Sequence, residues 1–129
     1  MNNLTFSNSH FFVGIDTHLN NWRVTIRNCG IELKTFSMNP SPNELYNYLI
    51  KRYPDGNYYV VYEAGFSGFW PQRKFNELGI NCIVVNPADV PSSGKEKAVK
   101  TDPNDSRKLA RALSAYISGT KKLRQIRLN

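Results

Sequence analysis

Phe11-Phe12-Val13-Gly14-Ile15-Asp16 is a short apolar run that ends in a carboxylate. This pattern is typical of a buried central strand whose last residue leaves the core at the edge of a sheet. The pattern returns at Tyr58-Tyr59-Val60-Val61-Tyr62-Glu63, and residues 80–86 form a third apolar run. The three runs predict the interior of a sheet, with acidic residues at the ends of two strands.

Alternating apolar and polar residues follow the first run. Residues 22–27 alternate, the turn Asn28-Cys29-Gly30 comes next, and residues 31–36 alternate again. Turn residues between two alternating stretches predict a β-hairpin. The first run and this hairpin are therefore expected to form three antiparallel strands.

Three helices are predicted. Ser41-Pro42-Asn43-Glu44 combines an N-cap serine, a proline at the first helical position and a capping-box glutamate. A second helix covers residues 69–78, and a third begins near Asp102 and stops at Gly119. The resulting order, βββαβαβα, indicates an α/β domain with a mixed sheet and helices on both faces.

Acidic residues are expected to meet at one edge of this sheet. A strand joined to its neighbour by a helical crossover runs parallel to it, so Asp16 and Glu63 would finish at the same edge. Open α/β sheets bind ligands at that edge. Asp102 and Asp105 precede the apolar stripe of the last helix (Leu109, Leu113 and Ile117) on the same side, so both should point toward the sheet.

Each of these four carboxylates also has a purely structural explanation. Asp16 can be a strand terminator, and Glu63 can pair with a distant base. Asp102 before Pro103 is a competent N-cap, and Asp105 suits the helix dipole. If all four converge, each ionised pair about 4 Å apart costs roughly 4 kcal/mol at an effective dielectric of 20, so the site needs cations unless some of the carboxylates are protonated.

Oxygen ligands without Cys or His favour Mg²⁺ or Mn²⁺. A carboxylate cluster that holds two such ions is the usual means of stabilising the attacking and leaving oxygens in phosphodiester chemistry. The four carboxylates are therefore candidate catalytic and metal-binding residues for phosphoryl transfer.

The net charge of +7 is confined to the C-terminal part of the chain. Up to Gly94 seven Lys and Arg residues balance seven Asp and Glu residues, whereas from Lys95 onward ten face three. This asymmetry indicates a polyanionic partner such as DNA, although a solvated basic tail is the alternative. The candidate contacts to a phosphate backbone are Lys95, Lys97, Lys100, Arg107, Lys108 and Arg111.

The length of 129 residues fits one globular domain with a single core. Cys29 and Cys82 lack companion His residues at ligand spacing, so neither a zinc site nor a disulfide framework is supported. No run approaches the roughly 20 apolar residues of a membrane helix, and residues 1–10 lack an apolar signal core. We expect a cytoplasmic protein with reduced thiols and no membrane partner.

Four motifs taken together carry a family resemblance. Val13-Gly14-Ile15-Asp16, Tyr62-Glu63-Ala64-Gly65, Val85-Asn86-Pro87 and Lys100-Thr101-Asp102-Pro103-Asn104-Asp105-Ser106-Arg107-Lys108-Leu109-Ala110 resemble, in this order, the N-terminal domain of the DEDD-type insertion-sequence transposases, which include the Piv-type DNA invertases. The last motif is the most specific of the four.

The resemblance implies a RuvC-like, ribonuclease-H-type fold for residues 11–118. It also implies a catalytic tetrad of Asp16, Glu63, Asp102 and Asp105 that coordinates Mg²⁺ or Mn²⁺ and recombines DNA. Some members of the family are guided by RNA, and the full-length protein is expected to be a homo-oligomer. Residues 1–10 would be a polar extension, and residues 119–129 a basic tail leading toward a C-terminal domain, with a nucleophilic serine, that this chain lacks.

Three other functions fit parts of the pattern. The first is a Holliday-junction-type, structure-specific nuclease that uses the same tetrad. The second is a non-catalytic nucleic-acid-binding module whose acids only cap helices and form ion pairs. The third is an actin-like sugar kinase or ATPase, which needs a glycine-containing phosphate turn after Asp16, whereas Thr17-His18-Leu19-Asn20 follows here.

Overall fold

The structure, a computed structural model, describes residues 6–65, 67–87 and 105–119. These residues form strands and helices in the predicted order βββαβαβα. The strands are β1 (His10–Thr17), β2 (Trp22–Asn28), β3 (Ile31–Met38), β4 (Asn57–Glu63) and β5 (Asn81–Val85). The helices are α1 (Pro42–Arg52), α2 (Trp70–Glu77) and α3 (Asp105–Ile117).

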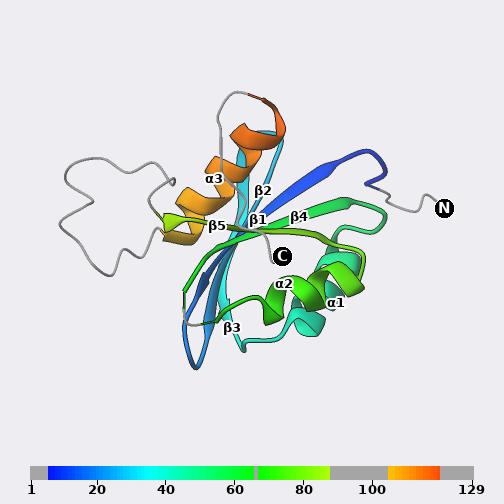
Figure 1. Cartoon of the computed structure of the whole chain (residues 1–129). Coiled ribbons are helices and arrows are strands. Elements are labelled where there is room, and N and C mark those ends of the chain that lie inside the picture. The colour runs from blue at the N-terminus through cyan, green and yellow to red at the C-terminus, as the bar shows by residue number, and fades with distance from the viewer. Residues whose placement is uncertain (1–5, 66, 88–104, 120–129) are drawn as a thin grey trace.

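The strands form one mixed sheet in the order β3-β2-β1-β4-β5 (Figure 1). β1 is antiparallel to β2, and β2 is antiparallel to β3. β4 is parallel to both β1 and β5. The predicted three-strand meander and the predicted parallel neighbours are both confirmed, so β1 and β4 end at the same edge of the sheet.

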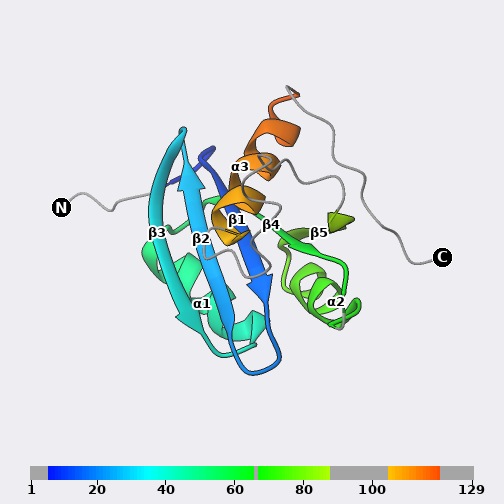
Figure 2. The same cartoon turned by 90° about the vertical axis from the view of Figure 1, so that its left-hand side faces the viewer.

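Helices cover both faces of the sheet, as predicted. α1 and α2 lie on one face and α3 lies on the other (Figures 1 and 2). The sheet has an apolar core on each face, and alternate residues of β1 pack into one core or the other. Phe11 and Val13 pack under α1 and α2, whereas Phe12 packs with Leu109 and Leu113 of α3. Even-numbered residues of β1, including Asp16, therefore face the side of the sheet that α3 covers.

The hairpin between β2 and β3 contains a tight turn and a bulge. Cys29 and Gly30 have φ angles of 52° and 78°, as a two-residue type I′ turn requires. The register shifts so that Arg27 pairs with Glu32, whereas Thr25 pairs with Thr35. Because Thr25 and Arg27 share a face, the extra residue of the bulge places Glu32 and Thr35 on that face too.

The helix ends follow the predicted chemistry where the structure describes them. The Ser41 hydroxyl accepts a hydrogen bond from the backbone N–H of Glu44 at 3.2 Å, as an N-cap should. α3 ends as predicted before Gly119, which has a φ of 83° and donates its N–H to the carbonyl of Tyr116 at 3.1 Å. The predicted start of this helix at Asp102 lies outside the described residues.

The predicted N-terminal extension is attached to the core from residue 6 onward. The ring of Phe6 packs edge-on against the rings of Phe11 and Tyr53, with centroids 5.6 and 5.7 Å apart. Its N–H also donates to the carbonyl of Pro54 at 2.9 Å. Residues 1–5 of the extension and residues 120–129 of the predicted basic tail lie outside the described residues.

Cys29 and Cys82 are both free thiols, as expected from their spacing. Among the helices that the structure describes, none has the length and apolar character needed to cross a membrane.

Candidate active site

Asp16 and Glu63 lie at the C-terminal ends of the neighbouring strands β1 and β4. Ile15 pairs with Tyr62, one residue before each acid. Val61 packs among residues of α3, so Glu63, two residues later, faces the same side of the sheet as Asp16. The two acids line a cavity of about 200 Å³ at this edge, together with Ile15, Thr17, Ala64, Gly65 and Pro87.

A third carboxylate, Asp105, is brought to these strand ends by the close approach of α3 to β1. A Cβ atom on Gly14 would lie 2.3 Å from the carbonyl oxygen of Ser106 and 2.5 Å from the backbone nitrogen of Ala110. Only glycine permits backbones to approach so closely. Because Gly14 is two residues before Asp16 and Ser106 directly follows Asp105, this contact holds the start of α3 near the end of β1.

Hydrogen bonds tie the first turn of α3 to β2 and β3. The hydroxyl oxygen of Thr25 is 2.8 Å from those of both Ser106 and Thr35. Thr35 donates to Oε2 of Glu32 at 3.2 Å, and Oε1 of Glu32 accepts from Nε of Arg107 at 2.9 Å. Since Ser106 and Arg107 are neighbours in α3, these five residues form a closed loop, which we call the polar ring.

Glu63 is in an unfavourable environment for a carboxylate. Burial raises the pKa of its carboxyl above the ordinary value, and the negative charges of Asp105 and Asp16 raise it further. The Lys108 ammonium acts in the opposite direction and lowers this pKa. Two carboxylates and one ammonium group therefore act on the Glu63 carboxyl at this edge of the sheet.

We expect Glu63→Gln to stabilise the metal-free protein at neutral pH. A carboxyl with a raised pKa in the folded state binds more protons there than in the unfolded state. Stability therefore falls as pH rises from the ordinary value of 4.5 through the raised value. Below about pH 4 the penalty is absent. Urea unfolding of the variant and the wild type in a chelator, at neutral pH and below about pH 4, measures the effect. An equal difference in the free energy of unfolding between the two proteins at these two pH values would contradict the prediction.

Two polar neighbours of Asp16 were not singled out from the sequence. Nε2 of His18 lies 3.0 Å from Oδ2 of Asp16. Arg23 is the cross-strand partner of Asp16, and its guanidinium donates to Oγ of Ser37 at 3.4 Å. The alternation of apolar and polar residues in β2 predicts that Arg23 lies on the opposite face of the strand from Trp22 and Val24. Only the strand register places Arg23 beside Asp16.

Three of the six residues predicted to contact phosphates lie in the described part of the chain. Arg107, Lys108 and Arg111 lie on α3, whereas Lys95, Lys97 and Lys100 fall outside the described residues, as does Asp102. Lys108 is close enough to Glu63 to affect its pKa, and Arg111 is exposed. Arg107 differs, because its guanidinium is paired with Glu32 in the polar ring and two thirds of its side chain is covered.

Within residues 6–65, 67–87 and 105–119, no three His, Cys, Asp or Glu side chains are grouped closely enough to hold a metal ion. The predicted tetrad also needs Asp102, which lies outside those residues. Asp16, Glu63 and Asp105 therefore share one electrostatic environment without forming a complete ligand shell by themselves.

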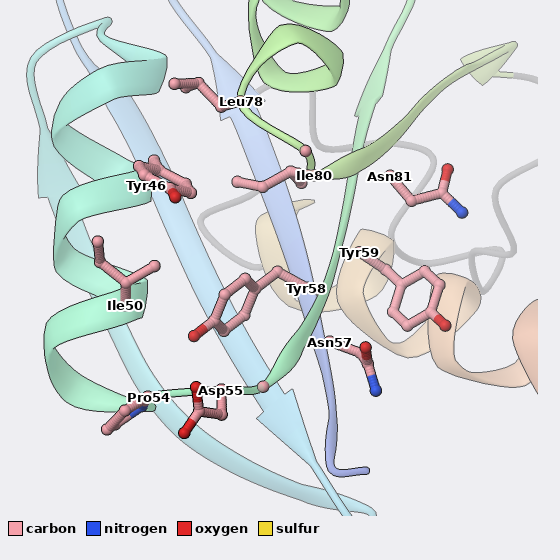
Figure 3. Close-up of a pocket in the computed structure, with 12 residues that line it drawn as sticks. Tyr46, Ile50, Pro54, Asp55, Asn57, Tyr58, Tyr59, Leu78, Ile80 and Asn81 are labelled. Carbon is pink, nitrogen blue, oxygen red and sulfur yellow. The ribbon is translucent and has the colours of Figure 1, made fainter. Parts of the chain in front are cut away.

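A larger cavity, of about 490 Å³, lies at the opposite end of the sheet (Figure 3). It is bounded by α1, by the residues after α2 and by the beginnings of β4 and β5, and its lining includes Tyr46, Tyr58, Leu78 and Ile80. Asp55 is the single carboxylate in this lining. Its chemistry therefore does not resemble that of the acidic edge.

Part of the chain is similar in sequence to transposases. It is 45% identical over 60 residues to a putative transposase of Sinorhizobium fredii, a match that covers 46% of this chain and 15% of the relative. It is 38% identical over 61 residues to the transposase of an insertion sequence element of Leptospira borgpetersenii, covering 47% and 17%. The chain thus matches less than a fifth of the length of either relative. No family model matches it.

Two solved structures match nearly the whole chain. RuvC of Thermus thermophilus aligns over 88% of this chain and 99% of RuvC, with a TM-score of 0.56 and 13% identity. The fold is RuvC-like. RuvC from the same organism in complex with a Holliday junction substrate aligns over 89% of the chain, with a TM-score of 0.53. The predicted RuvC-like fold is thereby confirmed.

Proposed function

We propose that this RuvC-like domain is the N-terminal catalytic domain of a DEDD-type transposase or Piv-type recombinase that carries out metal-dependent phosphoryl transfer on DNA. The observation that carries the proposal is that Asp16 and Glu63 line one cavity at the ends of β1 and β4, with Asp105 close enough to raise the pKa of Glu63. The sequence similarity to transposases favours recombination over the other functions of an acidic site.

The chemistry of the donor set fits a divalent metal ion. Its members are carboxylates, and Mg²⁺ and Mn²⁺ prefer such oxygen ligands. Burial is the largest cause of the raised pKa of Glu63, and a cation would relieve the repulsion from Asp105 and Asp16 that raises this pKa further. Asp16, Glu63 and Asp105 would hold the metal with Asp102 as the predicted fourth ligand. The bound metal would supply charge stabilisation to the attacking and leaving oxygens of the phosphodiester.

The other residues of the site would orient these acids and the DNA. His18 holds one oxygen of Asp16, and the polar ring holds the helix turn that carries Asp105. Lys108 and Arg111 on α3 would contact phosphates, as would Lys95, Lys97 and Lys100. Because Arg107 is paired with Glu32, we assign it a positioning role besides the predicted contact with DNA. RNA guidance and homo-oligomer formation are further proposals for the full-length protein.

Metal binding can be tested by thermal unfolding. Mg²⁺ or Mn²⁺ should raise the melting temperature of the 129-residue chain, because a ligand at 100 times its Kd stabilises a protein by about 2.7 kcal/mol. Asp16→Asn and Glu63→Gln should each abolish the shift. Asp55→Asn is the matched control, because Asp55 lines the cavity at the far end of the sheet and should leave the shift unchanged. A full metal shift in both site variants would refute the metal assignment.

DNA substrates separate the proposal from its alternatives. Cleavage of a four-way junction by the chain alone, dependent on Mn²⁺ and on Asp16, would favour a structure-specific nuclease. Binding to DNA with no metal-induced thermal shift would favour a non-catalytic module. Transposase function predicts metal binding and salt-sensitive DNA binding by this chain.

A further inference from the structure

Trp70 is an aromatic side chain that is partly exposed at the surface and stacked on the core. Its side chain is 45% exposed, although it is one of the largest apolar groups in the protein. Its ring stacks on the buried ring of Trp22, with centroids 6.0 Å apart and planes inclined by 29°. One side of the indole is therefore supported by the core while part of the ring remains accessible to a ligand.

The chain around Trp70 is anchored to β4. The hydroxyl of Tyr62 donates to the carbonyl of Gly68 at 2.8 Å and accepts from the backbone N–H of Gln72 at 3.3 Å. Tyr62 is buried and directly precedes Glu63. The end of β4 thus carries an acid on one face and, on the other, the residue that fixes the first turn of α2.

Cations and a hollow lie next to Trp70. A cavity of about 430 Å³ separates the start of α1 from α2, and its lining comprises Pro40, Ser41, Pro42, Asn43, Trp70, Arg73, Lys74 and Glu77. Arg73 is exposed and Lys74 is half-buried. Within the part of the chain that the structure describes, neither forms an ion pair with a carboxylate. We call Trp70, Arg73 and Lys74 the aromatic-basic patch.

The aromatic-basic patch lies at the same end of the sheet as the acids but on the opposite face. Trp22, which supports Trp70, pairs with Thr17, and the next pair along the hairpin is Asp16 with Arg23. Asp16 faces the α3 side, whereas Trp22 belongs to the core beneath α1 and α2. A nucleic-acid strand that reaches the acidic edge therefore needs to pass only around the end of the sheet to reach Trp70.

We propose that the aromatic-basic patch binds an unpaired nucleotide of a DNA strand. The base would stack on the accessible part of the Trp70 ring, and the adjacent phosphate would lie near Arg73 and Lys74. Stacking on an aromatic side chain needs a base that has left the duplex, and cationic side chains select the phosphate without reading sequence. The choice of DNA as the ligand rests on the proposed function.

Tryptophan fluorescence tests this inference directly. The chain has two tryptophans, and Trp22 is only 1% exposed. Titration of the 129-residue chain with a short oligothymidylate in EDTA should quench Trp70, and Trp70→Phe should abolish the quenching. Trp70→Ala should weaken binding by about tenfold, the loss expected for one stacked base. A duplex of the same length should cause no quenching, and equal quenching by the duplex would overturn the claim of an unpaired base.

The phosphate interaction has a separate readout. The double variant Arg73→Ala/Lys74→Ala should make the plot of log binding constant against log salt concentration less steep. The magnitude of the slope should fall by about 0.7 for each phosphate of the single strand that the variant no longer neutralises. Lys34→Ala/Lys51→Ala removes the same charge from exposed positions on β3 and α1, and should leave the slope unchanged. Equal slopes for the two double variants would overturn the phosphate assignment.

The outcomes also separate this inference from the proposed function. Asp16→Asn should retain oligothymidylate quenching, because metal binding and stacking use different faces of the sheet. If the oligonucleotide binds without quenching, and with the same affinity in Trp70→Ala as in the wild type, the proposed role of the aromatic-basic patch is wrong. The proposed metal site would be unaffected by that result. A wild-type chain that binds no DNA at low salt would overturn both.

Discussion

Gly14→Ala is expected to destabilise the protein by about 3 kcal/mol or more, at the upper end of what overpacking a core costs. The new methyl group would meet backbone atoms of Ser106 and Ala110 at 2.3 and 2.5 Å. Backbone atoms cannot move aside as a flexible side chain can, so α3 would have to shift away from β1. Chemical denaturation monitored by circular dichroism measures the loss.

Displacement of α3 has a second consequence for the site. Asp105 would move away from Asp16 and Glu63, so any folded fraction of Gly14→Ala should lose the metal-induced thermal shift. Asp55→Asn again serves as the control for the metal response, because Asp55 lines the cavity at the far end of the sheet. Wild-type stability and metal response in Gly14→Ala would show that α3 does not pack as described.

Thr25→Val is expected to cost about 1 to 3 kcal/mol, the penalty for leaving buried polar groups without partners. Thr25 is fully buried, and its hydroxyl interacts with those of both Ser106 and Thr35. Valine keeps the shape of threonine but removes this central member of the polar ring. Urea unfolding measures the loss, and hydrogen exchange at the start of α3 should show where it acts.

A double-mutant cycle with Ser106→Ala separates the hydrogen bond from general disturbance of the core. If the two hydroxyls interact as described, the double variant should lose less stability than the sum of the two single variants. Strict additivity would contradict the bond between β2 and α3. The hydroxyl of Thr25 bonds to Ser106, the residue after Asp105, so a weaker metal response in Thr25→Val would further show that the polar ring positions Asp105.

Much of the fold could be predicted because its signals are local. Apolar runs ending in Asp16 and Glu63, the turn at Cys29 and Gly30, and the cap at Ser41 each depend on neighbouring residues alone. Right-handed crossovers between parallel strands then limit how the strands can be ordered. The mixed sheet follows from these constraints, and the RuvC-like fold that the family resemblance implied agrees with the structural matches.

The site was less predictable because its contacts join distant segments. The sequence around Arg107 predicts a cation on a basic helix that is available to DNA. In the structure a bulge in β3 places Glu32, 75 residues earlier in the chain, on the face where it pairs with Arg107. Arg23 looks like an exposed strand residue until the register of β1 and β2 places it opposite Asp16. Catalysis by Asp16, Glu63, Asp102 and Asp105 stays a prediction.

The sequence by itself determined which residues end the central strands and which face of the last helix is apolar, because side-chain periodicity and capping act over a few residues. Only the tertiary structure decided how close α3 comes to β1, since that distance depends on Gly14 lying directly beneath Ser106 and Ala110. This long-range contact, reinforced by the polar ring, gives the start of α3 and its Asp105 a defined place beside Asp16 and Glu63.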